Sequence, residues 1–275
     1  MTVLGTPAQT RTPEASDVPP SSNFTPNSSS NSNSTKGPAM NPVLAVTQLH
    51  LTRKRMTFGL PVLYVGVVAV LSILISLIAW RAGSQPGSTG WIVSSRSNPG
   101  LVWALGGFLG YMGVASTATT FRFAITLGAT RRAFTLGTLL WNLVIASYLA
   151  VVLTVLAALE LATNHWFVGF YIFDIAILGN GNLPATFAIV LLGVLAMLTV
   201  AGVFGAAWIR FSNRGPILLG IGIGLVIVVA VLILVPQAAQ IVAAFEPWWL
   251  AIAAGVAIIA ASLGSWRLLR RAIIR

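Results

Sequence analysis

The sequence contains no cysteine and unusually few charged residues. Without cysteine the chain can form no disulfide, no thiolate metal site and no cysteine nucleophile. Charged side chains make up 8% of the 275 residues, whereas soluble domains carry roughly 25%. A water-soluble fold of this length could not cover its surface with so few charges, and 56% of the residues are hydrophobic. We therefore predict an integral membrane protein.

Other scarce residues exclude several kinds of chemistry. Histidine occurs only at His50 and His165, which argues against a multi-histidine metal site. Lysine occurs only at Lys36 and Lys54, and neither follows a glycine. A P-loop requires Gly-x4-Gly-Lys-Ser/Thr, so any ATP must be hydrolysed by another chain. The motifs HExxH and G-x-S-x-G are also absent, which disfavours a membrane protease or transferase. We predict no enzyme activity and no metal site in this chain.

Residues 1–40 differ in composition from the rest of the chain. They are rich in Ser, Thr, Asn and Pro, and such a segment cannot bury enough apolar surface to offset its conformational entropy. We predict a disordered tail over 1–40 and a six-span transmembrane domain over 41–275. At the start of that domain, Pro42–Met56 combines apolar residues with a basic cluster at 53–55. This pattern favours an interfacial helix, with a plain linker as the alternative.

Six hydrophobic segments are long enough to cross a bilayer, each with about 20 mostly apolar residues. Their cores contain no Asp, Glu, Lys, Arg or His. This disfavours a proton- or sodium-driven carrier, although ion coupling through backbone carbonyls and hydroxyls stays open. We predict an all-α integral membrane protein. The predicted spans are Thr57–Trp80, Leu101–Phe121, Thr135–Leu159, Ala185–Trp208, Ile217–Pro236 and Trp248–Ser265.

The distribution of basic residues predicts the orientation. With a cytoplasmic N-terminus, only Arg81 and Arg96 of the transmembrane domain fall in outer segments, as the positive-inside rule requires. A net charge of +11 would suggest nucleic acid in a soluble protein. Here the same rule accounts for it, so we expect no nucleic-acid partner and two cytoplasmic termini. The inner basic residues are Arg53, Lys54, Arg55, Arg122, Arg131, Arg132, Arg210, Arg214, Arg267, Arg270, Arg271 and Arg275.

Two segments between predicted spans are unusual. Leu161–Pro184 is too apolar for a free loop and too interrupted for a span, so we expect it to lie at or dip into the outer interface. Pro236–Pro247 resembles a short helix that leads into the last span. Neither segment is predicted to cross the membrane.

The most informative stretch is Phe121–Leu136, which reads FRFAITLGATRRAFTL. Gly128 suits the position after a helix C-cap, where φ is usually positive. Thr130 suits an N-cap, so that Arg131 and Arg132 begin the next helix. We predict that the second span continues or bends into a short cytoplasmic helix and turns at Gly128 before the third span starts. Cations at a helix N-terminus oppose the helix dipole, and anionic headgroups or an acidic partner would offset that cost.

This stretch resembles the cytoplasmic turn of the type-2 family of ATP-binding-cassette (ABC) exporter permeases, especially those of actinobacteria. In that family a short coupling helix precedes Gly-x-Ser/Thr-Arg-Arg, an aromatic residue and a glycine. The matching positions here are Gly128, Thr130, Arg131, Arg132, Phe134 and Gly137. A looser match, with a longer turn than is usual, lies at Gly202, Gly205, Arg210, Phe211 and Gly215. The resemblance extends from Pro42 to Arg275.

The resemblance implies a homodimer, or a heterodimer with a sister permease, in the plasma (inner) membrane. Separate ABC ATPase subunits would bind ATP and Mg²⁺, and this chain would need no cofactor. The contact with the ATPase would involve Arg122, Phe123, Leu127, Gly128, Thr130, Arg131 and Arg132. A stand-alone channel, secondary carrier or membrane scaffold without an ATPase is the alternative.

The resemblance also implies that the second and fifth spans line the substrate pathway. The candidates there are Tyr111, Met112 and Ser116, and Asn142 of the third span is a weaker one that we expect to hydrogen-bond a neighbouring helix. Glycines such as Gly113 favour close helix packing over substrate contact. An uncharged pathway suits an amphipathic drug-, peptide- or lipid-like cargo.

Overall fold

The computed structural model describes residues 41–52, 54–244, 246 and 248–271. The tail predicted to be disordered, residues 1–40, lies outside the described residues. Within the described part the regular structure is entirely helical, and six helices are long and apolar enough to span a membrane. They are α2 (Leu60–Arg81), α4 (Gly100–Thr126), α5 (Arg131–Ala162), α6 (Leu183–Phe211), α7 (Arg214–Leu234) and α9 (Trp248–Arg270). The prediction of an all-α, multi-pass membrane protein is confirmed.

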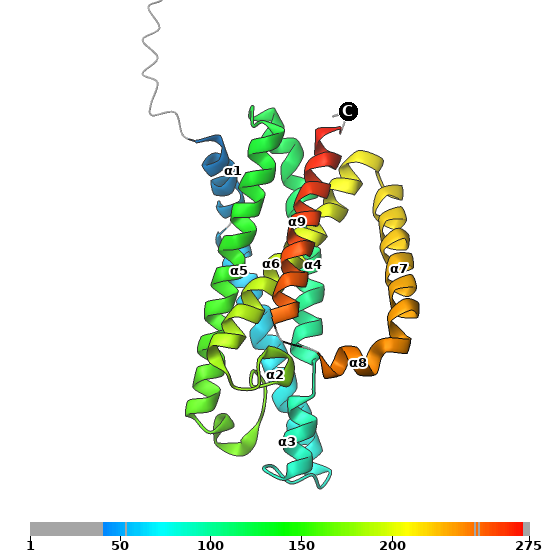
Figure 1. Ribbon diagram of the computed structural model, residues 1–275. Helices are drawn as coiled ribbons and strands as arrows, with labels where there is room; N and C mark the ends of the chain where they lie inside the picture. The colour runs from blue at the N-terminus through cyan, green and yellow to red at the C-terminus, as the bar shows by residue number, and fades with distance from the viewer. Residues whose placement is uncertain (1–40, 53, 245, 247, 272–275) are drawn as a thin grey trace, which may run out of the picture. The chain divides into compact units, whose positions relative to one another are not determined.

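The bundle has two ends, which we name after the residues found there. The Arg131 end holds the turn between α4 and α5, the turn between α6 and α7 and the end of α9 (Figure 1, top). The Asp174 end holds the segment between α5 and α6 and the short helix α3 (Thr89–Arg96), which the sequence did not predict. The predicted short helix before the last span is α8 (Ala238–Ala243).

The core of the bundle is formed by α4, α5 and α6. Leu109, Ile145, Leu149 and Leu198 are almost completely buried there. In the part of the chain that the structure describes, α6 contacts α4, α5, α7 and α9, so it is the central helix. Burial among neighbouring helices explains why no polar face is needed along its middle.

Small residues bring α4 and α6 close together. A Cβ added at Gly113 would lie 2.7 Å from Ala201 Cβ, and one added at Gly205 would lie 2.7 Å from the Val114 carbonyl oxygen. Small residues allow this approach between helices in lipid. A Cβ added at Gly106, by contrast, would meet no atom within 4 Å, and the same is true of several other glycines. Close packing therefore explains only some of the glycines.

The N-terminal helix α1 (Pro42–Leu51) packs on the first half of α5. The helix predicted over Pro42–Met56 ends earlier, at Leu51. A π-helical turn, η1 (Arg55–Gly59), then leads into α2. Val46 of α1 lies over Gly137, where an added Cβ would be 2.7 Å from the Val46 Cβ. Thr47 Oγ1 donates a hydrogen bond to the Gly137 carbonyl, with an O–O distance of 3.1 Å. Gly137 thus serves as the contact point for α1.

His50 completes the contact between α1 and α5. Its ring stacks on Trp141 with centroids 5.1 Å apart, and its Nε2 lies 3.3 Å from Thr138 Oγ1. Burial lowers the pKa of His50 from 6.5 to about 4, so the docked ring is neutral at pH 7. His50 has the higher pKa when α1 is undocked, so the undocked state binds the proton more readily.

We expect the docking of α1 to weaken as the pH falls from about 6.5 to about 4, because protonation then favours the undocked state. The full loss amounts to about 3 kcal/mol. Hydrogen exchange of the α1 amides across this pH range measures the effect, after correction for intrinsic exchange rates. His50→Phe should remove the pH dependence. A wild-type protection profile that does not change with pH would contradict the expectation.

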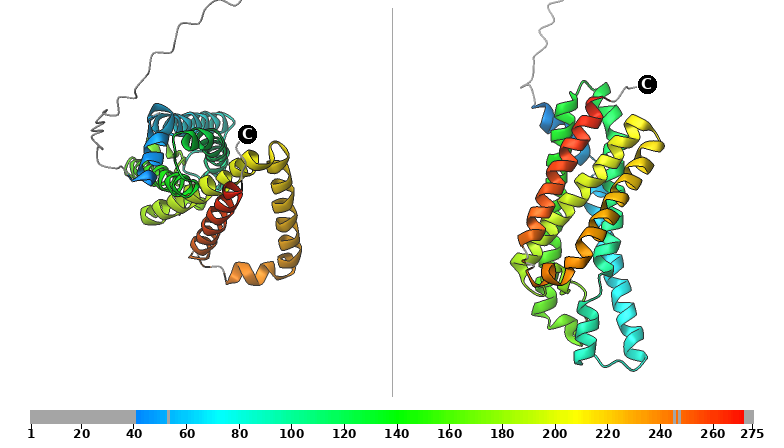
Figure 2. Two further views of the ribbon diagram at one scale, coloured as in Figure 1. Left: turned by 90° about the horizontal axis from the view of Figure 1, so that it is seen from above. Right: turned by 45° about the vertical axis from the view of Figure 1, so that its right-hand side comes forward.

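The helix α7 stands apart from α4 and α5. Figure 1 and both views of Figure 2 show it connected to the bundle through its turn with α6 and, at its other end, through α8. Its middle is exposed all round, with Val226 at 69% and Leu232 at 70%. An all-apolar helix can keep such a surface in lipid.

Candidate functional site

The turn between α4 and α5 is built by two local capping motifs. Gly128 has φ +84° and follows the C-cap of α4. The Gly128 N–H donates to the Ile125 carbonyl at 2.9 Å, and the Ala129 N–H donates to the Ala124 carbonyl at 3.0 Å, which is the Schellman pattern. Thr130 Oγ1 then accepts from the Ala133 N–H at 3.1 Å. Both predicted capping roles are confirmed.

A separate short helix between the second and third spans is not present. Instead, α4 runs without a break from Gly100 to Thr126, because no glycine or proline occurs between Val114 and Leu127 to interrupt it. The 27 residues of α4 extend about 40 Å, compared with a hydrocarbon core of about 30 Å. The segment predicted as a coupling helix is therefore the end of a long helix, and α4 is long enough to carry it out of the hydrocarbon.

Two buried aromatic residues hold this turn together. Phe121 of α4 and Phe134 of α5 are both fully buried, and their rings meet edge to face with centroids 5.1 Å apart. Such a pair contributes about 0.5–1.5 kcal/mol beyond its buried area. The pair fixes the end of α4 against the start of α5, so the turn moves as one unit.

The outside of the turn carries exposed apolar and cationic side chains. Phe123 is 53% exposed and Leu127 is 65% exposed, and Arg122 and Arg132 are exposed beside them. We call these four residues the turn surface. Most of the predicted coupling residues therefore lie on one accessible surface, with Gly128 and Thr130 forming the backbone of the turn.

Arg131 differs from its neighbour Arg132. The Arg131 guanidinium donates to the carbonyl oxygens of Leu269 and Arg270, at 2.8 and 2.6 Å. It therefore caps the C-terminal end of α9, where carbonyl groups lack intrahelical partners. The two arginines look equivalent in sequence, but Arg132 is exposed and forms no ion pair with a described residue.

The ion pair and the histidine–carboxylate contact found among the described residues both lie at the Asp174 end. Asp174 Oδ2 is 2.7 Å from an Arg96 nitrogen and 3.0 Å from His165 Nε2. The carboxylates of the described chain are Glu160, Asp174 and Glu246, and none of them pairs with an arginine of the Arg131 end. That end therefore carries excess positive charge.

Three of the four predicted pathway residues lie on α4. Tyr111 is 73% exposed, Met112 packs against the core, and Ser116 Oγ donates to the Gly113 carbonyl of its own helix at 3.0 Å. Asn142 lies elsewhere, at a small cavity that the other three do not line. We expected Asn142 to hydrogen-bond a neighbouring helix. Its Oδ1 is instead buried and accepts no hydrogen bond from a described residue.

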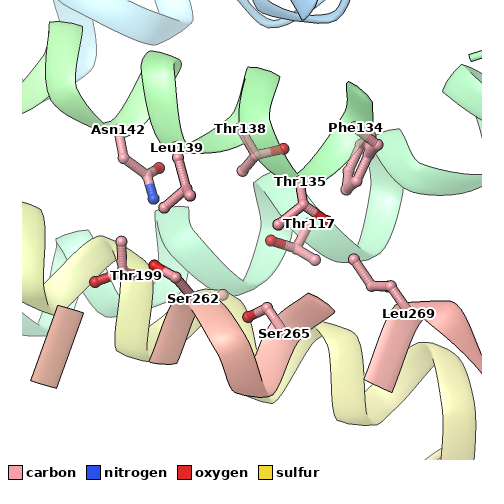
Figure 3. Close-up of a pocket in the computed structure, with 11 residues that line it drawn as sticks. Thr117, Phe134, Thr135, Thr138, Leu139, Asn142, Thr199, Ser262, Ser265 and Leu269 are labelled. Carbon is pink, nitrogen blue, oxygen red and sulfur yellow. The ribbon is translucent and has the colours of Figure 1, made fainter. Parts of the chain in front are cut away.

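The cavity lies where α4, α5, α6 and α9 meet, in the half of the bundle nearer the Arg131 end. Its volume is about 20 Å³. Hydroxyl and amide groups from all four helices line it, as Figure 3 shows. The lining residues are Thr117, Phe134, Thr135, Thr138, Leu139, Asn142, Thr199, Gly202, Ser262, Ser265 and Leu269.

A larger groove of about 520 Å³ is almost entirely apolar. Leucine and valine side chains of α4 and α6 line it, and Ile177 and Leu178 close it at the Asp174 end. Gly106 and Gly193 help to open it, because neither carries a side chain that would fill it. Its lining suits hydrocarbon rather than a polar ligand.

A polar cluster at the Asp174 end went unrecognised in the sequence. Glu160, at the end of α5, is fully buried, and its carboxylate accepts hydrogen bonds from the backbone N–H groups of Ile172, Phe173 and Asp174. The Trp166 indole N–H donates to the same carboxylate at 3.2 Å. The available signal was an acidic residue at the end of a long apolar helix, but its backbone partners lie 12–14 residues further on.

Comparison with protein-family models, curated proteins and solved structures found no match to this chain.

Proposed function

We propose that this chain is the membrane-spanning subunit of an ATP-driven exporter, and that a separate ATPase binds the turn surface. The observation that carries the proposal is the exposure of Phe123 and Leu127 on a rigid turn at the end of a helix about 40 Å long. Apolar side chains held outside the hydrocarbon favour burial by a protein partner. The proposal agrees with the lack of a P-loop in this chain.

The charge of the Arg131 end supports an acidic partner surface. Arg122 and Arg132 flank the apolar pair, and neither forms an ion pair with a described residue. Complementary charges at an interface speed association and fix the orientation of the partners. An ATPase cleft with acidic residues at its rim would satisfy both the apolar and the cationic parts of this surface.

The same turn would transmit motion to the spans. The Phe121–Phe134 contact joins the ends of α4 and α5, so a force on the turn surface displaces both helices together. Closure of the ATPase around ATP would then change the packing of α4 against α6. ATP and Mg²⁺ would reside on the ATPase, and this chain would supply only the mechanical link.

The proposed assembly contains two permease chains, identical or sister subunits, and lies in the plasma (inner) membrane. Its Arg131 end and both termini face the cytoplasm. An amphipathic drug-, peptide- or lipid-like cargo agrees with the uncharged spans. Tyr111, Met112 and Ser116 remain predicted pathway residues.

The test is to purify the full chain in nanodiscs with the ATPase encoded beside it and to measure ATP hydrolysis. Arg122→Glu with Arg132→Glu should lower the stimulated rate and the affinity of the complex about tenfold or more, because cations at the interface become anions. Leu127→Asp should act in the same direction. Arg131 is left unchanged because it caps α9.

The matched control is Arg267→Glu with Arg271→Glu, which makes the same charge change on exposed residues of the same end that are not part of the turn surface. Its complex should keep near wild-type activity. Normal assembly and ATP hydrolysis in the Arg122/Arg132 variant would contradict the proposal. Failure of every candidate ATPase to bind would favour the channel, carrier or scaffold alternative.

A further inference from the structure

The amide of Asn142 is a buried polar group with an unmet hydrogen-bonding requirement. Its side chain is 3% exposed, and its Oδ1 has no hydrogen-bond partner. A buried acceptor without a partner is strongly disfavoured, and such groups in proteins are usually satisfied by protein or by ordered water. Asn142 lines the cavity between α4, α5, α6 and α9 (Figure 3).

The cavity has the size of a single water molecule. Its volume is about 20 Å³, and a buried water requires about 10–15 Å³ measured in this way, together with two to four polar partners. Asn142 supplies one partner from α5, Thr199 another from α6, and Ser262 and Ser265 further ones from α9. The site therefore has both the room and the polar lining that a water needs.

Three of the hydroxyl groups around the cavity are already committed as donors. Thr135 Oγ1 donates to the Arg131 carbonyl at 3.1 Å, Thr199 Oγ1 donates to the Leu195 carbonyl at 2.7 Å, and Ser262 Oγ donates to the Ile258 carbonyl at 2.6 Å. Each of these oxygens keeps a lone pair that can accept a hydrogen bond. Together with Asn142 Oδ1, they form a set of acceptors on α5, α6 and α9 to which a water can donate.

We infer that the cavity binds one ordered water, which donates to Asn142 Oδ1 and to a hydroxyl oxygen of a neighbouring helix. Water is the smallest ligand that supplies two donors at once. The site is not assigned by the proposed transport function and does not depend on it.

A monovalent cation fits this site less well than water. No carboxylate lines the cavity to balance a cation. In addition, Leu269 lines the cavity, and its carbonyl accepts from the Arg131 guanidinium at 2.8 Å, so a positive charge already lies nearby. Bringing a second positive charge into this weakly polar environment would be unfavourable.

The water would tie α9 to the rest of the bundle. The helix α9 packs on α6 and α5, and its residues Ser262 and Ser265 contribute polar groups to the cavity. A bridge through water can break and re-form with little geometric constraint, because the water adjusts its position. The water bridge would therefore add an adjustable polar contact to the direct packing of α9 on α6.

The test is radiolytic footprinting of the full chain in nanodiscs, in which radicals formed from bound water oxidise side chains next to it. Leu269 lines the cavity and is 1% exposed, whereas Leu149 and Leu198 are equally buried but lie in the core and serve as internal references. We expect Leu269 to be oxidised well above both. Asn142→Leu should lower this labelling about fivefold, because the water loses a hydrogen bond.

A matched control is Thr154→Val. The Thr154 hydroxyl also belongs to α5 and is buried without a partner, but it does not line this cavity. This substitution should leave Leu269 labelling unchanged. If Asn142→Leu disturbs folding, Ser262→Ala with Ser265→Ala provides a second variant that should lower the labelling. Wild-type labelling of Leu269 no higher than that of Leu149 would overturn the inference. Stabilisation of the wild type by Na⁺ or K⁺ that is lost in Asn142→Leu would also overturn it, in favour of a cation site.

Discussion

Replacing Glu160 with alanine is expected to release the segment between α5 and α6 from the bundle. Glu160 Oε2 accepts from the Phe173 N–H at 2.8 Å, and Oε1 accepts from the Ile172 N–H at 3.0 Å and the Asp174 N–H at 3.2 Å. The carboxylate is fully buried, so water cannot replace it. Alanine would leave these donors and the Trp166 indole N–H unpaired.

The expected loss is large because several donors depend on one side chain. Each buried group without a partner costs about 1–3 kcal/mol, so the segment should lose about 3 kcal/mol or more. Asp174 would also lose its position, and with it the contacts to Arg96 and His165. This would detach α3, whose Trp91 indole N–H donates to the Gly169 carbonyl of the same segment at 2.7 Å.

Thermal unfolding in nanodiscs and limited proteolysis of residues 163–182 measure this effect. Glu160→Ala should lower the unfolding temperature and open the segment to cleavage. Glu160→Gln should have an intermediate effect on both measurements. Its amide oxygen can still accept hydrogen bonds, but its amide NH₂ is itself a donor and would face the donors of the segment. Glu246→Ala removes the same charge at an exposed position and should change neither measurement. A protease-resistant segment in Glu160→Ala would show that the carboxylate does not hold it.

The second large effect is expected at the crossing of α4 and α6. Gly205→Ala would place a Cβ 2.7 Å from the Val114 carbonyl oxygen and 2.9 Å from Thr117 Cβ. Both neighbours belong to a packed helix, so α4 and α6 would have to separate. Overpacking of this kind destabilises by about 1–3 kcal/mol.

Gly193→Ala on the same helix is the matched control with the opposite expected sign. A Cβ at Gly193 would meet no atom within 4 Å. Alanine in an open helix interior is favoured over glycine by about 0.5–1 kcal/mol, so this variant should be slightly more stable. Thermal unfolding of both variants in nanodiscs gives the comparison. Equal effects of the two substitutions would contradict the close packing of α4 against α6.

The six spans and the turn between α4 and α5 could be read from the sequence because their signals are local. About 20 consecutive apolar residues define a span wherever it lies in the bundle. Likewise, Gly128 and Thr130 bond to backbone groups within five residues of themselves. The boundaries of the spans were accordingly predicted to within a few residues, and the two capping roles correctly.

The sequence by itself therefore determined the membrane class, the spans and the capped turn, since backbone hydrogen bonds and hydropathy act over short distances along the chain. Only the tertiary structure decided which of similar residues pack or pair. Arg131 bonds to α9 from 138 residues away, while Arg132 stays exposed. Gly113 touches α6, while Gly106 opens a groove. Such differences arise from contacts between distant segments, and no local pattern in the chain records them.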